Sequence, residues 1–315
     1  MRKPETATWE WLARLPIVFR VFVCIVALVT VIPVTARAQT PREYLNIPID
    51  ELAGFVEYTV TRSQSASSAA LAAPNDLTFS RLTVPYILYS FPFRGKYGGV
   101  SATMPFVRVE TADGTVKSSG FADLGLAFHA NLRGLPAVTR EKLSTYVPRT
   151  IVSLHMTVNV PVGTHDKNAA INTGANRWAF TPLVNLNIPR KKGREWYEFY
   201  VSTRFFTANN QFQTNKRLTQ KPLFMLTGHY SHNIGKKMWG AVGGTYDNGG
   251  RSSVDGVRQD NYVNGFRPQA TISRLFFNRV GVSLRYENTQ TSDKQSHRNS
   301  SLSIRIGSYL WTRKP

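Results

Sequence analysis

Three histidines, His129, His155 and His229, occupy polar positions in stretches where apolar and polar residues alternate. Imidazole nitrogens are good ligands for zinc and other transition metals, so these residues are candidates for a metal site. They lie far apart along the chain, however, and no close ligand spacing joins them. Polar side chains that fill the interior of a β-structure account for them better. We therefore expect neither a metal site nor any other cofactor.

A second candidate constellation is formed by His229, Ser231 and His232, because a histidine can activate a serine hydroxyl for hydrolysis. The alternation places His229 and Ser231 on the polar face of one predicted strand, whereas lipid hydrolysis needs groups at a lipid-facing surface. The chain has no Gly-rich phosphate loop, no CxxC, no HExxH and no nucleophile elbow. No residue is predicted to be catalytic, and we expect the protein not to be an enzyme.

The elements that position these residues are strands. Apolar and polar residues alternate strictly in 152–160, 184–188, 197–206, 280–287 and 302–307. A period of two indicates a strand with one apolar and one polar face. The stretches are longer than the roughly 5 or 6 residues usual in soluble domains and suit the roughly 9 to 11 that a tilted membrane-spanning strand needs. A soluble β-sandwich is the alternative.

Aromatic residues gather near the ends of the alternating stretches, as they do at both membrane interfaces of outer-membrane barrels. The residues in question are Tyr89, Phe91, Trp178, Phe180, Trp196, Tyr197, Phe276, Phe277, Tyr309 and Trp311. Their position favours the membrane-spanning alternative, with the aromatic rings in two interfacial girdles.

The sequence thus predicts an all-β fold, a transmembrane antiparallel up-and-down β-barrel of about twelve strands. The strands are expected at 51–62, 77–91, 97–109, 120–131, 150–162, 175–188, 195–207, 222–234, 238–247, 264–277, 280–290 and 300–311. The odd-numbered links, from 63–76 to 291–299, are long and polar, as extracellular loops are, and four of the five even-numbered links are short, as periplasmic turns are. The exception, 132–149, is expected to hold a short periplasmic helix near 136–146.

The first 38 residues are predicted to be a signal peptide, and 39–315 the outer-membrane barrel. Basic residues precede an apolar run from Val21 to Val34, and the small residues Ala36 and Ala38 follow, as a cleavage site requires. An uncleaved membrane helix is the alternative, but it would need roughly 20 apolar residues. The single cysteine, Cys24, lies in this segment, so the exported fold does not depend on disulfides.

The formal net charge of +20 suggests an anionic partner. Export argues against nucleic acid and for outer-membrane lipids and lipopolysaccharide. The short turns are basic, as at Lys236 and Lys237, which suits either contact with lipid headgroups or simple solvation.

If the apolar positions face lipid, the polar positions between them line the lumen, because a charged side chain facing lipid is costly. The predicted pathway residues are Asp123, His129, His155, Asn159, Asn185, Glu198, Arg204, His229, Arg267, Arg285, Glu287 and Arg305. The four arginines predict a mildly cationic wall that would favour anionic solutes. The alternative is that these side chains only brace and fill a narrow barrel.

Four stretches carry a resemblance to a known family: 119–126 (SGFADLGL), 172–182 (NTGANRWAFTP), 230–237 (YSHNIGKK) and 284–288 (LRYEN). In these the chain resembles the proteobacterial outer-membrane transporter family named for the MetA pathway of phenol degradation. The similarity extends over most of residues 77–311. The resemblance implies an outer-membrane channel or transporter, often associated with the catabolism of aromatic compounds, and supplies no catalytic residue.

The expected function is therefore passive passage of small solutes through an outer-membrane barrel, with aromatic or hydrophobic solutes suggested by the resemblance alone. A non-conducting structural or adhesive barrel is the first alternative, and an outer-membrane hydrolase the second. Besides lipids and small-molecule solutes, the barrel-assembly machinery is an expected partner.

Overall fold

The computed structural model describes residues 39–45, 47–64, 67–68, 71–74, 77–112, 114, 116–143, 145–169, 171–291 and 298–312. The predicted signal peptide, residues 1–38, lies outside the described residues. No helix among the described residues is long and apolar enough to span a membrane.

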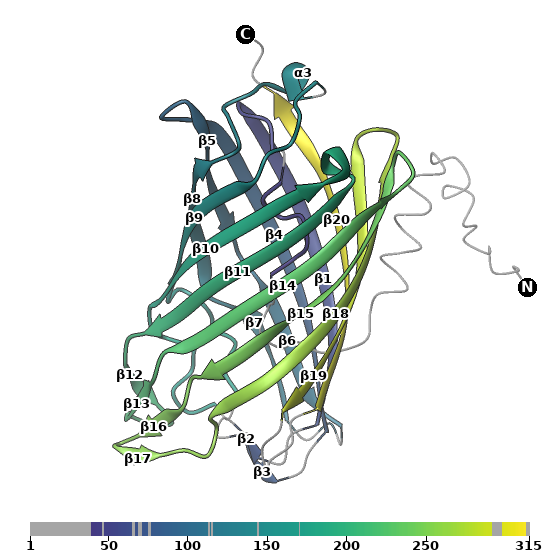
Figure 1. The fold of residues 1–315 in the computed structure, drawn as a ribbon. Coiled ribbons are helices and arrows are strands. Elements are labelled where there is room, and N and C mark those ends of the chain that lie inside the picture. The colour runs from purple at the N-terminus through teal and green to yellow at the C-terminus, as the bar shows by residue number, and fades with distance from the viewer. Residues whose placement is uncertain are drawn as a thin grey trace, which may run out of the picture.

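The described chain forms a closed antiparallel barrel of twelve strands (Figure 1). Its strands, in order around the ring, are β1 (Glu51–Gln64), β4 (Leu77–Phe93), β5 (Lys96–Thr103) with β6 (Phe106–Thr111), β8 (Leu124–Arg133) with β7 (Lys117–Phe121), β9 (Ile151–Val160), β10 (Ala179–Arg190), β11 (Glu195–Phe206), β14 (Leu223–Ile234), β15 (Met238–Gly249), β18 (Val263–Phe276), β19 (Val280–Thr291) and β20 (Arg298–Thr312). The predicted fold class and strand number are confirmed.

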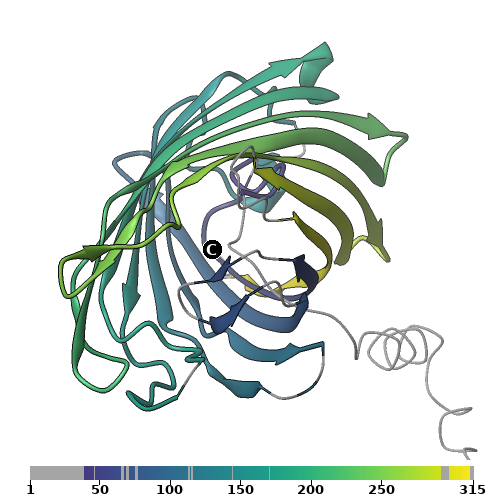
Figure 2. The ribbon, with the colours of Figure 1, turned by 90° about the horizontal axis from the view of Figure 1, so that it is seen from below.

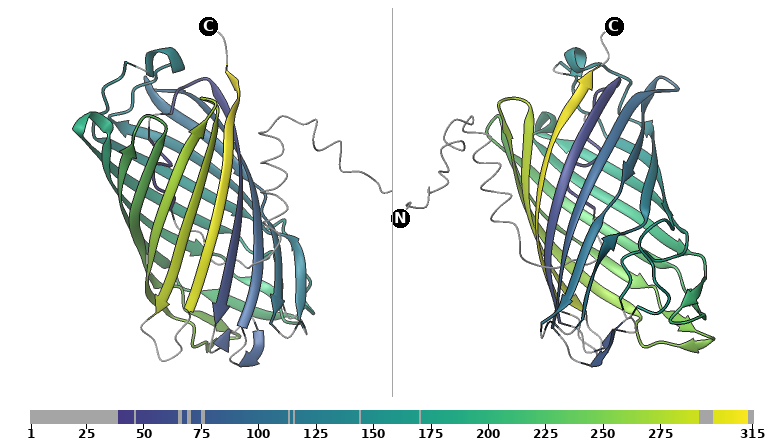
Figure 3. Two further views of the ribbon diagram at one scale, coloured as in Figure 1. Left: turned by 90° about the vertical axis from the view of Figure 1, so that its right-hand side faces the viewer. Right: turned by 180° about the vertical axis from the view of Figure 1, so that it is seen from behind.

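The ring closes where β1 pairs with β20 on one side and with β4 on the other. Figure 3 shows the last strand, in yellow, beside the first, in purple. Across this seam the Thr59 and Ser303 hydroxyls are 2.9 Å apart and those of Thr61 and Ser301 2.6 Å apart. The seam is therefore held by side chains as well as by the backbone ladder.

Two of the predicted strands are each interrupted once. The predicted strand 97–109 is divided into β5 and β6 at Met104 and Pro105, and the strand 120–131 into β7 and β8 at Ala122 and Asp123. Proline has no N–H to give to the ladder. Its carbonyl oxygen instead accepts the Ala122 N–H at 2.7 Å, so the two interruptions lie side by side in the wall.

The long links gather at one end of the barrel, the lower end in Figure 1, which is the extracellular end by the predicted topology. Three of them contain short strands that the sequence did not reveal: β2 (Ser67–Ser68) and β3 (Leu71–Pro74), β12 (Asn209–Phe212) and β13 (Lys216–Gln220), and β16 (Ser252–Val254) and β17 (Val257–Arg258). β13 pairs with β16, so the last two links form one small sheet.

The opposite, periplasmic end has short turns and one longer link. That link contains the helix α3 (Arg140–Leu143), which is shorter than the helix predicted near 136–146, and a further turn contains the 3-10 helix η1 (Lys191–Gly193). Pro136 is engaged elsewhere, in an isolated bridge with Lys96, which limits how early a helix can begin. Arg140 makes two 2.8 Å hydrogen bonds to the buried Glu51 carboxylate and so ties α3 to the first strand.

Side chains alternate between the outside and the inside of the barrel as the sequence pattern predicts. In β18 the pattern is a nearly regular succession of buried and exposed residues, and the exposed positions include Phe266 and Ile272. The buried positions of the same strand, among them Arg267 and Gln269, are polar. An apolar outside around a polar inside is the arrangement of a membrane barrel.

One predicted member of the aromatic girdle does not lie there. Trp196 is 1% exposed and packs inside the periplasmic end with Ile49, Tyr97, Leu135 and Ile151. Its position follows from the alternation, because the neighbouring Tyr197 points outward and is exposed. The indole N–H donates to the Gly193 carbonyl oxygen at 3.0 Å. The prediction for Trp196 was wrong, and this apolar cluster narrows the periplasmic end instead.

The prediction that the apolar side chains of the strands face lipid can be tested by placing a charge near the midplane of the membrane. Leu154, in the middle of β9, is 43% exposed on the outside, so Leu154→Arg should reduce the free energy of unfolding by roughly 2–4 kcal/mol. Val147→Arg is the matched control, because Val147 is exposed in the periplasmic link outside the strands. Urea titrations followed by heat-modifiable gel mobility measure both. Equal stability of the two variants would contradict the lipid-facing assignment of β9.

Candidate functional site

The lumen is crossed by residues 39–45, which we call the lumen segment. Figure 2 looks along the barrel and shows this part of the chain, in dark purple, inside the ring of strands. The segment contacts inward-pointing side chains of strands on different sides of the ring, and it leads into β1 through Ile47 and Ile49, which join the periplasmic cluster. The sequence analysis did not assign this segment any role.

In the middle of the lumen segment, Arg42 is bound to β11 and β14. Its backbone N–H donates to a Glu198 carboxylate oxygen at 2.7 Å, its Nε to the Ser231 hydroxyl at 2.9 Å, and its Nη1 to the Asn233 amide oxygen at 2.5 Å. The fully buried Glu198 also accepts hydrogen bonds from the Tyr200 and Ser231 hydroxyls, at 2.6 and 3.2 Å. The Ser231 hydroxyl thus links the Arg42 guanidinium to the Glu198 carboxylate, in addition to the direct bond from the Arg42 backbone N–H.

Towards β1, Tyr44 stacks on the imidazole of His155, with 3.9 Å between ring centroids. The structure brings His129 and His155 together on β8 and β9, with their Nδ1 atoms 2.8 Å apart. Ser101 Oγ lies 3.0 Å from His129 Nε2, and His155 Nε2 lies 2.7 Å from Asn185 Oδ1. One proton on each ring satisfies this whole chain of hydrogen bonds, with His129 protonated at Nδ1 and His155 at Nε2.

At the other end of the lumen segment, the Thr40 hydroxyl accepts hydrogen bonds from Arg285 and Arg305, at 2.8 and 3.0 Å. Both arginines also bind the buried carboxylate of Glu57, at 3.0 and 2.7 Å. The backbone oxygen of Gln39 lies 3.2 Å from His229 Nε2. The segment therefore bridges β19 and β20 on one side of the lumen and β9, β11 and β14 on the other.

A further buried ion-pair network lies nearer the extracellular end. Arg267 binds both oxygens of Asp247, at 2.5 and 2.9 Å, and one oxygen of Glu287 at 3.1 Å. Glu57 and Asp247 were absent from the predicted lumen set, although both fall on the inward positions of β1 and β15. Three of the four arginines of the predicted cationic wall are thus paired with carboxylates, which weakens the expected anion preference along that wall.

The fourth arginine, Arg204, lies near the extracellular end of β11 and donates to Asn159 Oδ1 at 3.1 Å. Arg177, from the link before β10, lies close by and hydrogen-bonds the Gln220 side chain. Burial and then the neighbouring Arg204 lower the pKa of Arg177 to about 10. Arg177 therefore keeps its charge at neutral pH, and the nearby Asp123 carboxylate offsets part of the positive charge of the two arginines.

Asp123 anchors an extracellular link. Its two carboxylate oxygens accept the backbone N–H groups of Gly163 and Ala175, each at 3.1 Å. Gly163 and Gly174 approach so closely that a Cβ on Gly174 would lie 2.5 Å from the Gly163 carbonyl carbon, so neither position has room for a side chain. Two of the family-like stretches, 119–126 and 172–182, thus meet in space. Asp123 therefore holds the two ends of the link between β9 and β10 together.

The predicted pathway residues are all buried or half-buried, and none of them faces lipid. The structure does not assemble the Ser/His constellation, since the Ser231 hydroxyl is engaged by Glu198 and Arg42 and His232 lies 3.3 Å from Glu195. Among the described residues no group of three or more His, Cys, Asp or Glu side chains could hold a metal ion.

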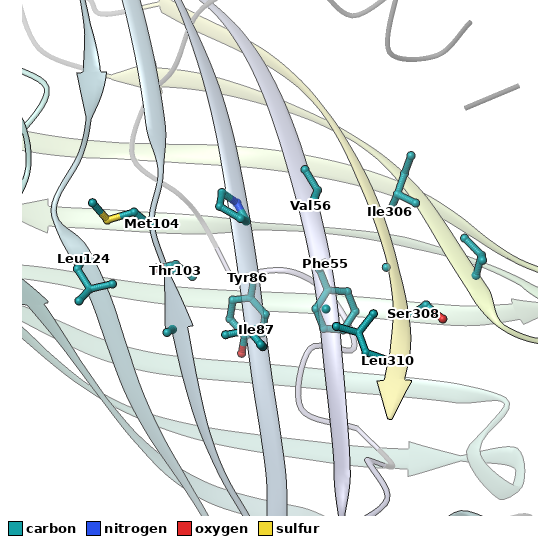
Figure 4. A pocket seen from close by; sticks show the side chains of 15 residues that line it. Phe55, Val56, Tyr86, Ile87, Thr103, Met104, Leu124, Ile306, Ser308 and Leu310 are labelled. Atoms are coloured by element: carbon teal, nitrogen blue, oxygen red, sulfur yellow. The ribbon is translucent and has the colours of Figure 1, made fainter. Parts of the chain in front are cut away.

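An apolar groove of about 800 Å³ lies on the outer surface beside the seam (Figure 4). Side chains of β20, β1 and β4 line it, including Leu310, Val56 and Ile87, and Met104 borders it where β5 ends. The groove lies among the outward-facing side chains of the wall, and its lining is almost wholly apolar.

The model of the family described as "MetA-pathway of phenol degradation" matches residues 63–306. No curated protein sequence matches the chain.

Among solved structures, an outer membrane channel from Pseudomonas putida F1 has a TM-score of 0.75 at 16% identity, over 87% of this chain and 100% of that one. The β domain of the Bordetella autotransporter BrkA has a TM-score of 0.51 at 9% identity, over 83% and 100% of the two chains. A deletion mutant of the monoaromatic hydrocarbon channel TodX has a TM-score of 0.50 at 8% identity, over 84% and 92%. These likenesses establish an outer-membrane barrel fold.

Proposed function

Because the chain belongs to the family described as "MetA-pathway of phenol degradation", we propose that it is an outer-membrane channel for small solutes, closed at rest by its own lumen segment. Aromatic solutes are favoured by the family description and by the fold shared with a monoaromatic hydrocarbon channel. The protein acts by passive passage and carries out no reaction.

The observation that carries this proposal is how the lumen segment is held. Its contacts are hydrogen bonds, one stacked ring and charged groups, made to polar side chains of the wall. Water can replace such contacts, unlike the dense apolar packing of a protein core. A structure of this kind supports reversible opening, whereas a barrel filled by a rigid core would support only a structural role.

Removal of the signal peptide during export would give the lumen segment a free end. Cleavage after Ala38 would make Gln39 the first residue of the mature protein, and its backbone oxygen already lies within hydrogen-bonding distance of His229. A lumen segment that begins at a free end can leave and re-enter the lumen, which a segment tethered at both ends cannot do.

Planar-bilayer recordings test the function. We expect the purified protein to open rarely, and millimolar benzoate to interrupt the ion current more than acetate at equal concentration, because its ring can stack on the aromatic and imidazole groups of the lumen. Acetate controls for the carboxylate charge. A barrel that never conducts, even without its lumen segment, would instead be a structural barrel. If neither benzoate nor acetate interrupts the current, the proposal that aromatic solutes pass through the channel is wrong.

A further inference from the structure

A second site lies on the outside of the barrel, at its extracellular end. A pocket of about 290 Å³ is lined by Lys221, Arg251, Ser253, Arg258 and Tyr262. Lys221 and Arg251 precede and follow the β14–β15 hairpin, and the Lys221 N–H donates to the Arg251 carbonyl oxygen at 2.9 Å. Ser253 and Arg258 come from the small hairpin of β16 and β17. Three cations thus surround one cavity.

The three cations are not paired with acidic side chains among the described residues. In the part of the chain that the structure describes, no carboxylate forms an ion pair with Lys221, Arg251 or Arg258. Asp255, the acidic residue of the same hairpin, accepts the Arg217 N–H at 2.7 Å. The Nε of Arg251 is buried and has no hydrogen-bond acceptor, and its guanidinium lies 5.2 Å from the centre of the Tyr262 ring. The site therefore offers three positive charges and an unpaired N–H donor, which suit the binding of an anion.

The position of the pocket identifies the source of that anion. The Tyr262 hydroxyl donates to Asn248 Oδ1 at 2.9 Å, and the Asn248 amide donates to the Tyr246 hydroxyl at 3.2 Å. Tyr246 is exposed on the lipid-facing side of β15, in line with Val242. This chain of contacts leads from the apolar belt directly to the pocket, which therefore lies at the level of the outer-leaflet headgroups.

We propose that this pocket binds a phosphate group of lipopolysaccharide lipid A, with Arg251 and Lys221 as the principal ligands and Arg258 completing the positive field. An oxygen of the phosphate accepts the unpaired Arg251 N–H, and the acyl chains extend along the exposed apolar residues of β14 and β15. This inference is independent of whether the barrel conducts.

Lipid A binding to the purified, folded protein in detergent tests the proposal, with affinity measured by native mass spectrometry. The test variant is Lys221→Gln with Arg251→Gln. The matched control is Lys236→Gln with Lys237→Gln, which removes the same charge from exposed residues of a periplasmic turn. Heat-modifiable mobility verifies that both variants form barrels.

We expect the test variant to bind bisphosphorylated lipid A about 25-fold more weakly, since each surface cation contributes about fivefold. The control should bind as the wild type does, and dephosphorylated lipid A should not distinguish the three proteins. An equal loss in both variants, or no loss in the test variant, overturns the proposal. Full displacement of lipid A by inorganic phosphate at equal concentration also overturns it, since the pocket would then be a site for soluble anions.

Discussion

Replacing both Arg42 and Tyr44 with alanine is expected to raise the open probability of the channel by roughly 100-fold. Arg42→Ala removes two side-chain hydrogen bonds, to Ser231 and Asn233, and leaves the buried Glu198 without its neighbouring cation. Tyr44→Ala removes the ring stacked on His155. A charge-assisted hydrogen bond contributes about 1.5–3 kcal/mol and a stacked ring about 0.5–1.5 kcal/mol, so the closed state loses roughly 3 kcal/mol or more.

Single-channel recording measures this effect directly. Thr227→Val with Thr245→Val is the control, because these buried hydroxyls lie 2.7 Å apart on β14 and β15 and bond to each other, not to the lumen segment. If the control opens as often as the Arg42/Tyr44 variant, the loss of lumen packing in general causes the opening, and the segment is not the gate. If neither variant conducts, the barrel does not form a channel.

The second large effect concerns stability. Arg267 is 4% exposed and bridges Asp247 and Glu287, so Arg267→Met leaves two buried carboxylates without a counter-charge. Removing one partner of a buried ion pair typically costs about 3–5 kcal/mol, because the remaining charge is desolvated and unpaired. We expect the urea midpoint of unfolding to fall accordingly.

Neutralising Asp247 and Glu287 as well distinguishes the effect of the Arg267 charge from the effect of its packing. Adding Asp247→Asn and Glu287→Gln to Arg267→Met should recover much of the lost stability, since no buried charge then lacks a partner. A single Arg267→Met variant as stable as the wild type would show that water reaches these carboxylates. A triple variant as unstable as the single one would show that the arginine acts through its packing.

The sequence predicted the features that depend on neighbouring residues, and it missed those that depend on contacts between distant parts of the chain. Alternation is local, so the strands, their number and the side of the wall on which each side chain lies could be predicted from neighbouring residues. His129 and His155 illustrate the limit. Both were correctly placed on polar positions, but their contact depends on the register of β8 and β9, which the residue pattern does not specify.

The pairing of the arginines was missed for the same reason. Arg285 and Glu57 lie on strands far apart in the sequence, and only ring closure brings them within 3.0 Å. The lumen segment was missed because it is irregular and has no period to detect. Its polar residues, among them Thr40, Arg42 and Tyr44, could not be distinguished from those of an exposed terminus.

The seam between β1 and β20 has a consequence for the order in which the molecule forms. It joins the two ends of the chain, and such non-local pairing is the slowest kind in folding. The lumen segment contacts Arg285 and Arg305 on the last two strands and also Glu198 on β11, so its full set of contacts needs strands that have already curved into the barrel. We therefore expect the segment to dock late in folding, so that a newly inserted barrel is open until its amino-terminal segment binds.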